Sequence, residues 1–276
     1  MSAPTEARPP RRDLVAAVIV GLTLAAIFLI TLFTHRAAFS TFVGLIIVAG
    51  VVEASHVLRQ QGVRVAVPVV LVTAVVVMVA AYRMGPPGTT VGLAVLFAGA
   101  VLWQLFDRGR EDVIRRVGAT LLMGVWIPIL GSFAVLLAGW PVDPELAVLG
   151  TIGAAAVTDV AAYAWGSQIG RTKLAPSVSP SKTWEGLLGG IATTVVLAAI
   201  ILPRLGDLFT WSSASILALT VGLATTAGDL VESMVKRDVG IKDLGGLLPG
   251  HGGILDRVDG IVFALPVGFY TLMLLG

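Results

Sequence analysis

Charged residues and glycines gather in one stretch of an otherwise apolar chain, residues 228–259. The stretch carries several carboxylates, several bases and a histidine, with glycines among them. Glycine lets a backbone approach a ligand closely, and carboxylates mixed with bases suit a metal ion and a polyphosphate bound together. A solvated loop between two membrane helices is the alternative, but such loops rarely repeat carboxylates at helical spacing beside a glycine-rich run. The stretch therefore predicts a site that binds metal and phosphate.

Carboxylates are also expected at a similar depth near one membrane surface. Asp229 and Glu232 are three residues apart and share a helix face, as do Asp256 and Asp259, while Asp159 lies toward the end of an earlier apolar segment. Carboxylates in apolar spans are costly, which favours a functional interpretation. The alternative for each one alone is an interfacial carboxylate paired with a nearby Lys or Arg. Together they predict one polar site at that surface.

Glu53 and His56 form a second polar pair, on one face of an early apolar segment. A polar contact between helices, or a contact with lipid headgroups, explains this pair at least as well as catalysis does. Their role stays open from the sequence.

Hydroxyl groups and cations alternate in the segment 167–185. Thr183 is placed to cap a helix that opens at Trp184, and a helix N-terminus with hydroxyls and a lysine is a plausible phosphate site. The segment lacks the GxxxxGK[ST] pattern of a phosphate-binding loop, and a capped, solvated loop would have much the same composition. The groups are Ser177, Ser179, Ser181 and Thr183, with Arg171, Lys173 and Lys182.

The composition defines the class of protein. The 276 residues are 56% hydrophobic and 13% charged, and they include no cysteine, whereas soluble domains carry about 25% charged residues. Long apolar runs indicate a polytopic membrane protein, and the missing cysteine excludes disulfides and thiol chemistry. We predict an all-α fold with nine transmembrane spans, at about 14–34, 38–58, 65–83, 89–106, 114–138, 146–166, 186–203, 212–232 and 257–275.

The basic residues predict the orientation and the parts of the chain. With the N-terminus in the cytoplasm, every Lys and Arg except Arg36, Arg83 and Arg204 falls on the cytoplasmic side, as the positive-inside rule requires. We expect a disordered cytoplasmic tail over 1–13, N-terminal transmembrane helices over 14–145, and a catalytic transmembrane region over 146–276. Two loops, 167–185 and 233–256, would face the cytoplasm.

The run from Ser233 to Asp259 resembles the signature of phosphatidate cytidylyltransferases, also called CDP-diacylglycerol synthases. Two upstream pieces agree with that family, one from Asp159 to Arg171 and one from Ser179 to Gly186, so the resemblance covers about residues 150–270. It implies that CTP and phosphatidate react to CDP-diacylglycerol and diphosphate. It also implies dependence on Mg²⁺, with K⁺ as a candidate second ion, an all-helical membrane fold and a homodimer. We expect the protein in the cell membrane, with no nucleic-acid partner.

The resemblance also implies roles for particular residues. Its metal ligands correspond to Asp229 and Asp256, and Asp259 either joins them or pairs with Lys236 or Arg237. His251 is expected to donate to phosphate or to play a structural part. The candidate catalytic residues are Asp229, Asp256, Lys236, Arg237 and His251; the candidate substrate-binding residues are Asp159, Lys173, Ser179, Ser181, Lys182, Thr183, Lys242 and Arg257.

Two other functions are compatible with such a chain. A CTP-dependent lipid kinase would keep the architecture but attack a different phosphorus. A secondary transporter would place its ionisable residues near the bilayer midplane on broken helices, whereas here they fall at the cytoplasmic ends of the spans. The motif spacing favours the cytidylyltransferase.

Overall fold

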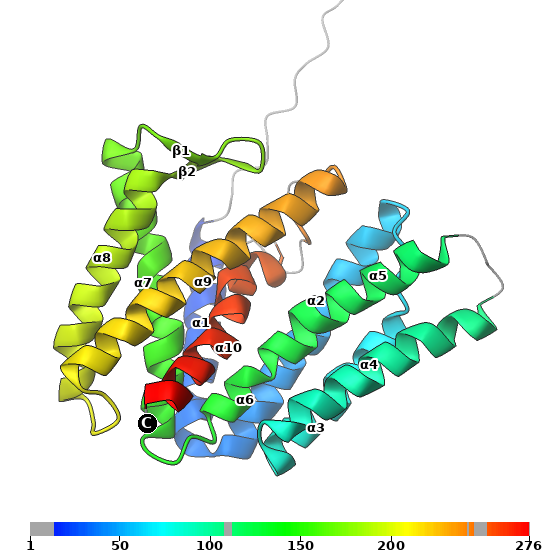
Figure 1. Cartoon of the computed structure of the whole chain (residues 1–276), viewed down its shortest axis with the longest axis horizontal. Helices are drawn as coiled ribbons and strands as arrows, with labels where there is room; N and C mark the ends of the chain where they lie inside the picture. The colour runs from blue at the N-terminus through cyan, green and yellow to red at the C-terminus, as the bar shows by residue number, and fades with distance from the viewer. Residues whose placement is uncertain (1–13, 108–111, 242, 246–252, 276) are drawn as a thin grey trace, which may run out of the picture.

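The computed structural model is an assembly of long apolar helices (Figure 1). It describes residues 14–107, 112–241, 243–245 and 253–275, with side chains from Val18 onward. Within these ranges, eight segments are long and apolar enough to cross a membrane, and α1 contributes a ninth, shorter apolar stretch, Val18–Thr34. The predicted all-α membrane fold is therefore confirmed, while the predicted tail over 1–13 lies outside the described residues.

The first half of the chain forms one group of helices. Its fifth span, Val113–Leu137, is not one regular helix, because a π-helix at Val125–Ile129 with Pro128 inside it joins α5 to α6. Proline lacks the N–H that an α-helix interior needs, which explains the irregularity. The helices are α1 (Leu14–Thr34), α2 (Arg36–Gln60), α3 (Val67–Met84), α4 (Pro87–Phe106), α5 (Val113–Gly124) and α6 (Phe133–Leu137).

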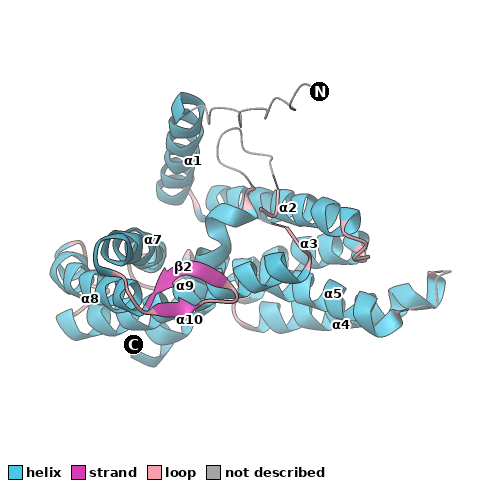
Figure 2. Cartoon of the chain, turned by 90° about the horizontal axis from the view of Figure 1, so that it is seen from above, coloured by secondary structure: helices cyan, strands magenta, loops and turns pink. Residues whose placement is uncertain are grey.

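The second half forms the group that carries most of the predicted site. Helix α7 packs along α8 and α9, and α9 packs along α10, while α6 of the first group contacts both α7 and α10 and so joins the two groups. Viewed from above, α7–α10 lie on one side and α2–α5 on the other (Figure 2). The helices are α7 (Pro144–Ile169), α8 (Trp184–Ile201), α9 (Trp211–Asp238) and α10 (Leu255–Leu275).

The segment 167–185, expected as a loop, contains a small antiparallel hairpin of β1 (Lys173–Ala175) and β2 (Ser179–Thr183). Strands this short and polar leave no alternating apolar pattern that could have revealed them. The predicted cap is confirmed, because the Thr183 hydroxyl accepts a hydrogen bond from the backbone N–H of Gly186 at the start of α8. The cap ties the hairpin directly to that helix.

Helix α9 continues to Asp238, past the expected end of its span at residue 232. Met234, Lys236 and Arg237 are good helix formers, and the helix ends only where Gly240 takes a positive φ of 73°. Lys236 and Arg237 therefore lie on the last turns of a helix and not in a loop. Lys236 is thereby placed one turn beyond Glu232, on the same face.

Candidate active site

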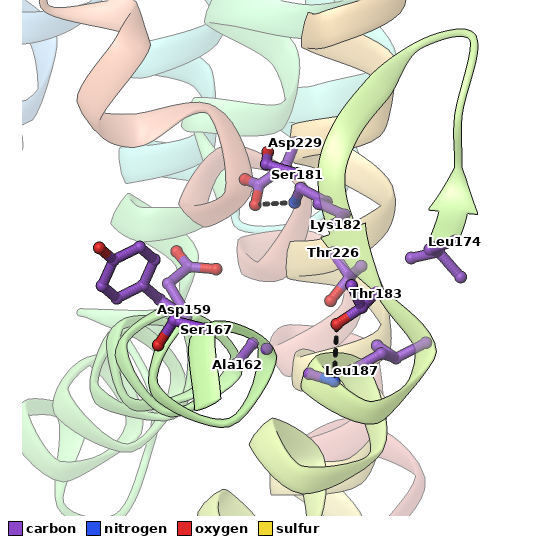
Figure 3. A pocket seen from close by; sticks show the side chains of 13 residues that line it. Asp159, Ala162, Ser167, Leu174, Ser181, Lys182, Thr183, Leu187, Thr226 and Asp229 are labelled. Atoms are coloured by element: carbon purple, nitrogen blue, oxygen red, sulfur yellow. Dashed lines mark hydrogen bonds and ion pairs between the residues drawn. The ribbon is translucent and has the colours of Figure 1, made fainter. Parts of the chain in front are cut away.

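A pocket of about 410 Å³ that contains charged side chains lies between the hairpin and the neighbouring parts of α7, α8 and α9 (Figure 3). Three elements that are distant in the sequence supply its charged groups: Asp159 from α7, Lys182 from β2 and Asp229 from α9. The pocket thus unites the hydroxyl-rich segment with two of the predicted carboxylates. Its polar lining comes from Asp159, Tyr163, Ser167, Ser181, Lys182, Thr183, Thr226 and Asp229.

An ion pair between Lys182 and Asp229 spans the pocket (Figure 3). Its side chains are 25% and 19% exposed, so the pair is partly shielded and yet reachable from solvent. Asp159 faces the same pocket, so two carboxylates share one lysine there. This excess of negative charge favours a bound cation.

Close packing of α9 on α10 fixes the position of Asp229. A Cβ added at Gly260 would lie 2.6 Å from Asp229 Oδ1, and one added at Gly228 would lie 3.0 Å from the Asp259 carbonyl oxygen. Only glycine at both positions lets the two helices approach so closely. This contact sets the Asp229 carboxylate against the first turns of α10.

A second charged cluster lies where α9 approaches the start of α10. Lys236 Nζ donates to Glu232 Oε2 at 2.7 Å and pairs with Asp256 Oδ1 at 2.6 Å. Asp256 also accepts hydrogen bonds from the backbone N–H groups of Leu244, at 3.1 Å, and Gly253, at 3.0 Å. The Asp256 carboxylate therefore holds Leu244 and Gly253, which belong to the glycine-rich segment 240–253, to α10.

The structure gathers some predicted residues and leaves others apart. Asp159, Ser181, Lys182, Thr183 and Asp229 line one pocket, and Lys236 and Asp256 form the second cluster. Among the described residues, neither cation suggested for Asp259 pairs with it: Lys236 pairs with Glu232 and Asp256, and Arg237 donates to the Val178 carbonyl.

The remaining candidates lie outside the lining of this pocket. Lys173 is exposed on β1, Ser179 is buried in β2, and Arg257 is exposed at the start of α10. Arg237 is exposed and donates to the Val178 carbonyl at 3.4 Å, so it links α9 to the hairpin turn. Lys242 and His251 lie outside the described residues.

Sequence reasoning missed three polar residues of the pocket. Thr226 lies three residues before Asp229, and Tyr163 and Ser167 follow Asp159 by one and two turns. That helical spacing from a predicted carboxylate was the available signal. It was not decisive, because the same spacing is common on lipid-facing and packing surfaces.

The carboxylates fit a magnesium site in charge and chemistry. Mg²⁺ prefers carboxylate oxygens and usually binds through one or two of them together with substrate phosphates. Among the described residues, no three Asp, Glu or His side chains are arranged to hold an ion by themselves. Lys182 and Lys236 instead neutralise Asp229 and Asp256.

These features define a polytopic membrane protein with a charged pocket framed by otherwise apolar helices. The chain belongs to the cytidylyltransferase family, whose model matches residues 15–275. The resemblance carried by the sequence motifs is thereby confirmed and extended to the first half of the chain.

Relatives of known name share much of its length. A phosphatidate cytidylyltransferase of Mycobacterium bovis is 33% identical over 300 residues, which cover 98% of this chain and 92% of the relative. One from Synechocystis sp. is 32% identical over 292 residues, which cover 96% of this chain and 97% of the relative. One from Brucella suis is 49% identical over 107 residues, 39% of each chain.

Proposed function

We propose that this protein transfers the cytidylyl group of CTP to phosphatidate and so forms CDP-diacylglycerol and diphosphate. The observation that carries the proposal is the match to the cytidylyltransferase family over nearly the whole chain. Full-length relatives named phosphatidate cytidylyltransferase support the same reaction. The pocket suits it as well, because a charged cavity framed by apolar helices can receive a soluble nucleotide and a lipid headgroup.

In this reaction an oxygen of the lipid phosphate attacks the α-phosphorus of CTP. A new P–O bond forms at the α-phosphorus. The bond between this phosphorus and the oxygen that bridges to the β-phosphate breaks, and diphosphate leaves. Such transfers need positioning and charge neutralisation more than covalent help from the protein. Lys182 and Lys236, with Arg237 on the last turn of α9, are the candidates to hold the nucleotide phosphates by charge-assisted hydrogen bonds.

Asp229 and Asp256, with Asp259 beside them, are the proposed ligands of Mg²⁺, and K⁺ is proposed as a second ion. The bound metal would neutralise the charge that develops on the transferred and leaving phosphates. The chain's own groups do the remaining work. Thr183 holds the start of α8 against β2, and Gly228 and Gly260 hold Asp229 at the edge of α10.

The cellular setting follows from the same proposal. CTP is soluble and phosphatidate is a lipid, so both meet only at a membrane surface. We place the protein in the cell membrane with its N-terminus and active site toward the cytoplasm, on the strength of the basic residues. A homodimer is the proposed assembly; chemical cross-linking in native membranes that yields only monomer would contradict it.

Product analysis with labelled nucleotide tests the reaction. Purified protein receives phosphatidate, Mg²⁺ and CTP labelled at either the α- or the γ-phosphate. We expect the α-label in the lipid product and the γ-label in diphosphate. Transfer of the γ-label to lipid would instead identify a CTP-dependent lipid kinase, and no incorporation of either label would overturn the proposal.

A further inference from the structure

We propose that Glu53 is a positioning residue for this site: it clamps the neck of the glycine-rich segment. The neck consists of Leu244 and Gly245 on one side and Gly253 and Ile254 on the other. The catalytic consequence of the clamp rests on the function proposed above, but its structural part does not. Through it, the first half of the chain supports a site built mainly from the second half.

Glu53 lies on α2 with only 4% of its surface exposed. Its Oε2 accepts a hydrogen bond of 2.6 Å from the backbone N–H of Ile254, which is 201 residues later in the chain. A Cβ added at Gly245 would collide with Glu53 Cδ, Cγ and Oε1. The carboxylate therefore fills the space that the missing side chain of Gly245 leaves, while it binds the other side of the neck.

Asp256 closes the same neck from α10. It accepts hydrogen bonds from Leu244 on one side and from Gly253 on the other. The two sides lie close together, since a Cβ added at Gly253 would be 3.0 Å from the backbone nitrogen of Gly245 and equally far from Glu53 Oε2. Two carboxylates from different halves of the chain thus hold the two sides of the neck.

This arrangement connects Glu53 to the second charged cluster. Asp256 is held by Lys236, which also binds Glu232. Displacing the neck would remove two backbone donors from Asp256 and change the direction of its carboxylate. Supporting groups of this kind typically alter metal affinity or activity by about 10- to 100-fold when they are removed.

A purely structural role for Glu53 is the competing explanation. Burying a carboxylate is costly unless it is hydrogen-bonded. Glu53 Oε2 accepts such a bond from the backbone N–H of Ile254 in the neck. Ionised acceptors form strong, short bonds to backbone N–H groups, so this contact is well suited to fix the neck.

Three substitutions of Glu53 separate the effect of its side-chain length from the effect of its charge. Glu53→Gln keeps the length and one acceptor oxygen, Glu53→Asp keeps the charge but is one carbon shorter, and Glu53→Ala keeps neither. We expect kcat to fall roughly 10- to 100-fold for Asp and Ala and several-fold less for Gln, with a smaller change in KM for CTP. If Glu53→Asp retains more activity than Glu53→Gln, or if only KM changes, the proposal that Glu53 positions the neck through the length of its side chain is wrong.

A double-mutant cycle tests the contact with Gly245 directly. Gly245→Ala should lower kcat strongly in the wild-type background, because its methyl group collides with Glu53. In the Glu53→Ala background the same change should have little further effect, since the collision is gone. Equal losses in both backgrounds would show that the two residues do not act together.

Hydrogen–deuterium exchange without substrates tests the clamp apart from the reaction. Peptides that contain Ile254 should exchange faster in Glu53→Ala and near the wild-type rate in Glu53→Gln. Ile47→Ala is the matched control, because Ile47 is buried on the same helix and packs near Gly131, away from the neck. If Glu53→Ala leaves this exchange unchanged, or Ile47→Ala speeds it equally, the clamp is refuted, whichever reaction the protein catalyses.

Discussion

Lys182 and Lys236 each neutralise a carboxylate that the proposed reaction requires. Lys182 binds Asp229 across the pocket, and Lys236 binds Asp256 beside the neck. A lysine ammonium carries three donors, so one that pairs with a carboxylate can also donate to a phosphate. At the scale of single residues, the site is therefore two lysine–carboxylate pairs, each of which includes one residue of α9.

Lys182→Ala tests the first of these pairs. The loss of one charge-assisted contact to phosphate costs on the order of 1.5–3 kcal/mol, so kcat/KM for CTP should fall about 10- to 100-fold. Arg64→Ala is the control, because it removes an exposed cation from the α2–α3 connection, away from the pocket. Steady-state kinetics with varied CTP make the measurement. Unchanged kcat/KM in Lys182→Ala would exclude its role.

Asp229→Asn and Asp256→Asn test the proposed metal ligands. Asn keeps the size and one acceptor oxygen but lacks the negative charge that holds a hard cation. Both variants should lose nearly all turnover while they still fold and insert, and added Mg²⁺ should restore little. Asp207→Asn, which changes an exposed carboxylate in the α8–α9 connection, should behave as wild type. The comparison is turnover against Mg²⁺ concentration; a variant with wild-type kcat and Mg²⁺ dependence is not a metal ligand.

At the scale of elements, the packing of α9 on α10 positions Asp229. Gly260 leaves no room for a side chain between Asp229 Oδ1 and Thr225. Helix interiors otherwise disfavour glycine by roughly 0.5–1 kcal/mol relative to alanine. Gly260 thus lowers the intrinsic stability of α10 but lets α9 and α10 approach closely.

Gly260→Ala should therefore displace the Asp229 carboxylate and lower turnover at least about tenfold. Gly153→Ala on α7 is the matched control, since a Cβ there would meet no atom within 4 Å. The control should keep its activity and gain up to about 1 kcal/mol of stability. Turnover and thermal unfolding in detergent give the two readouts. Equal activity in both variants would show that the close approach does not set the site.

At the scale of the whole molecule, the helices place the pocket and the neck at the expected cytoplasmic end of the bundle. The two halves of the chain meet through contacts of α6 with α7 and α10 and of Glu53 with the neck. The first half therefore contributes more than a hydrophobic scaffold.

Labelling of a single cysteine tests the orientation. The chain has no cysteine, so Ser181→Cys provides one exposed thiol on β2 at the pocket. An impermeant maleimide should label it in inverted vesicles and not in intact cells. Arg83→Cys, at the expected outer end of α3, should show the reverse pattern. Labelling of position 181 only in intact cells would show that the orientation is opposite to the proposed one.

The sequence by itself determined the class of fold and the family. Runs of apolar residues near bilayer length are a local property, so the spans could be located without a structure. The motif from Ser233 to Asp259 and the cap at Thr183 are likewise local patterns. The motif identified the family, and the structure confirms the cap. Boundaries were less certain, as the extension of α9 to Asp238 shows.

Only the tertiary structure decided which of these residues meet. Lys182 and Asp229 are 47 residues apart, and Glu53 and Ile254 are 201 apart. Such contacts depend on how helices cross, and crossing depends on small residues such as Gly228 and Gly260, whose effect is not visible in hydropathy. The sequence therefore left the role of Glu53 open and Thr226 unnoticed, because burial and partners are properties of the packed bundle.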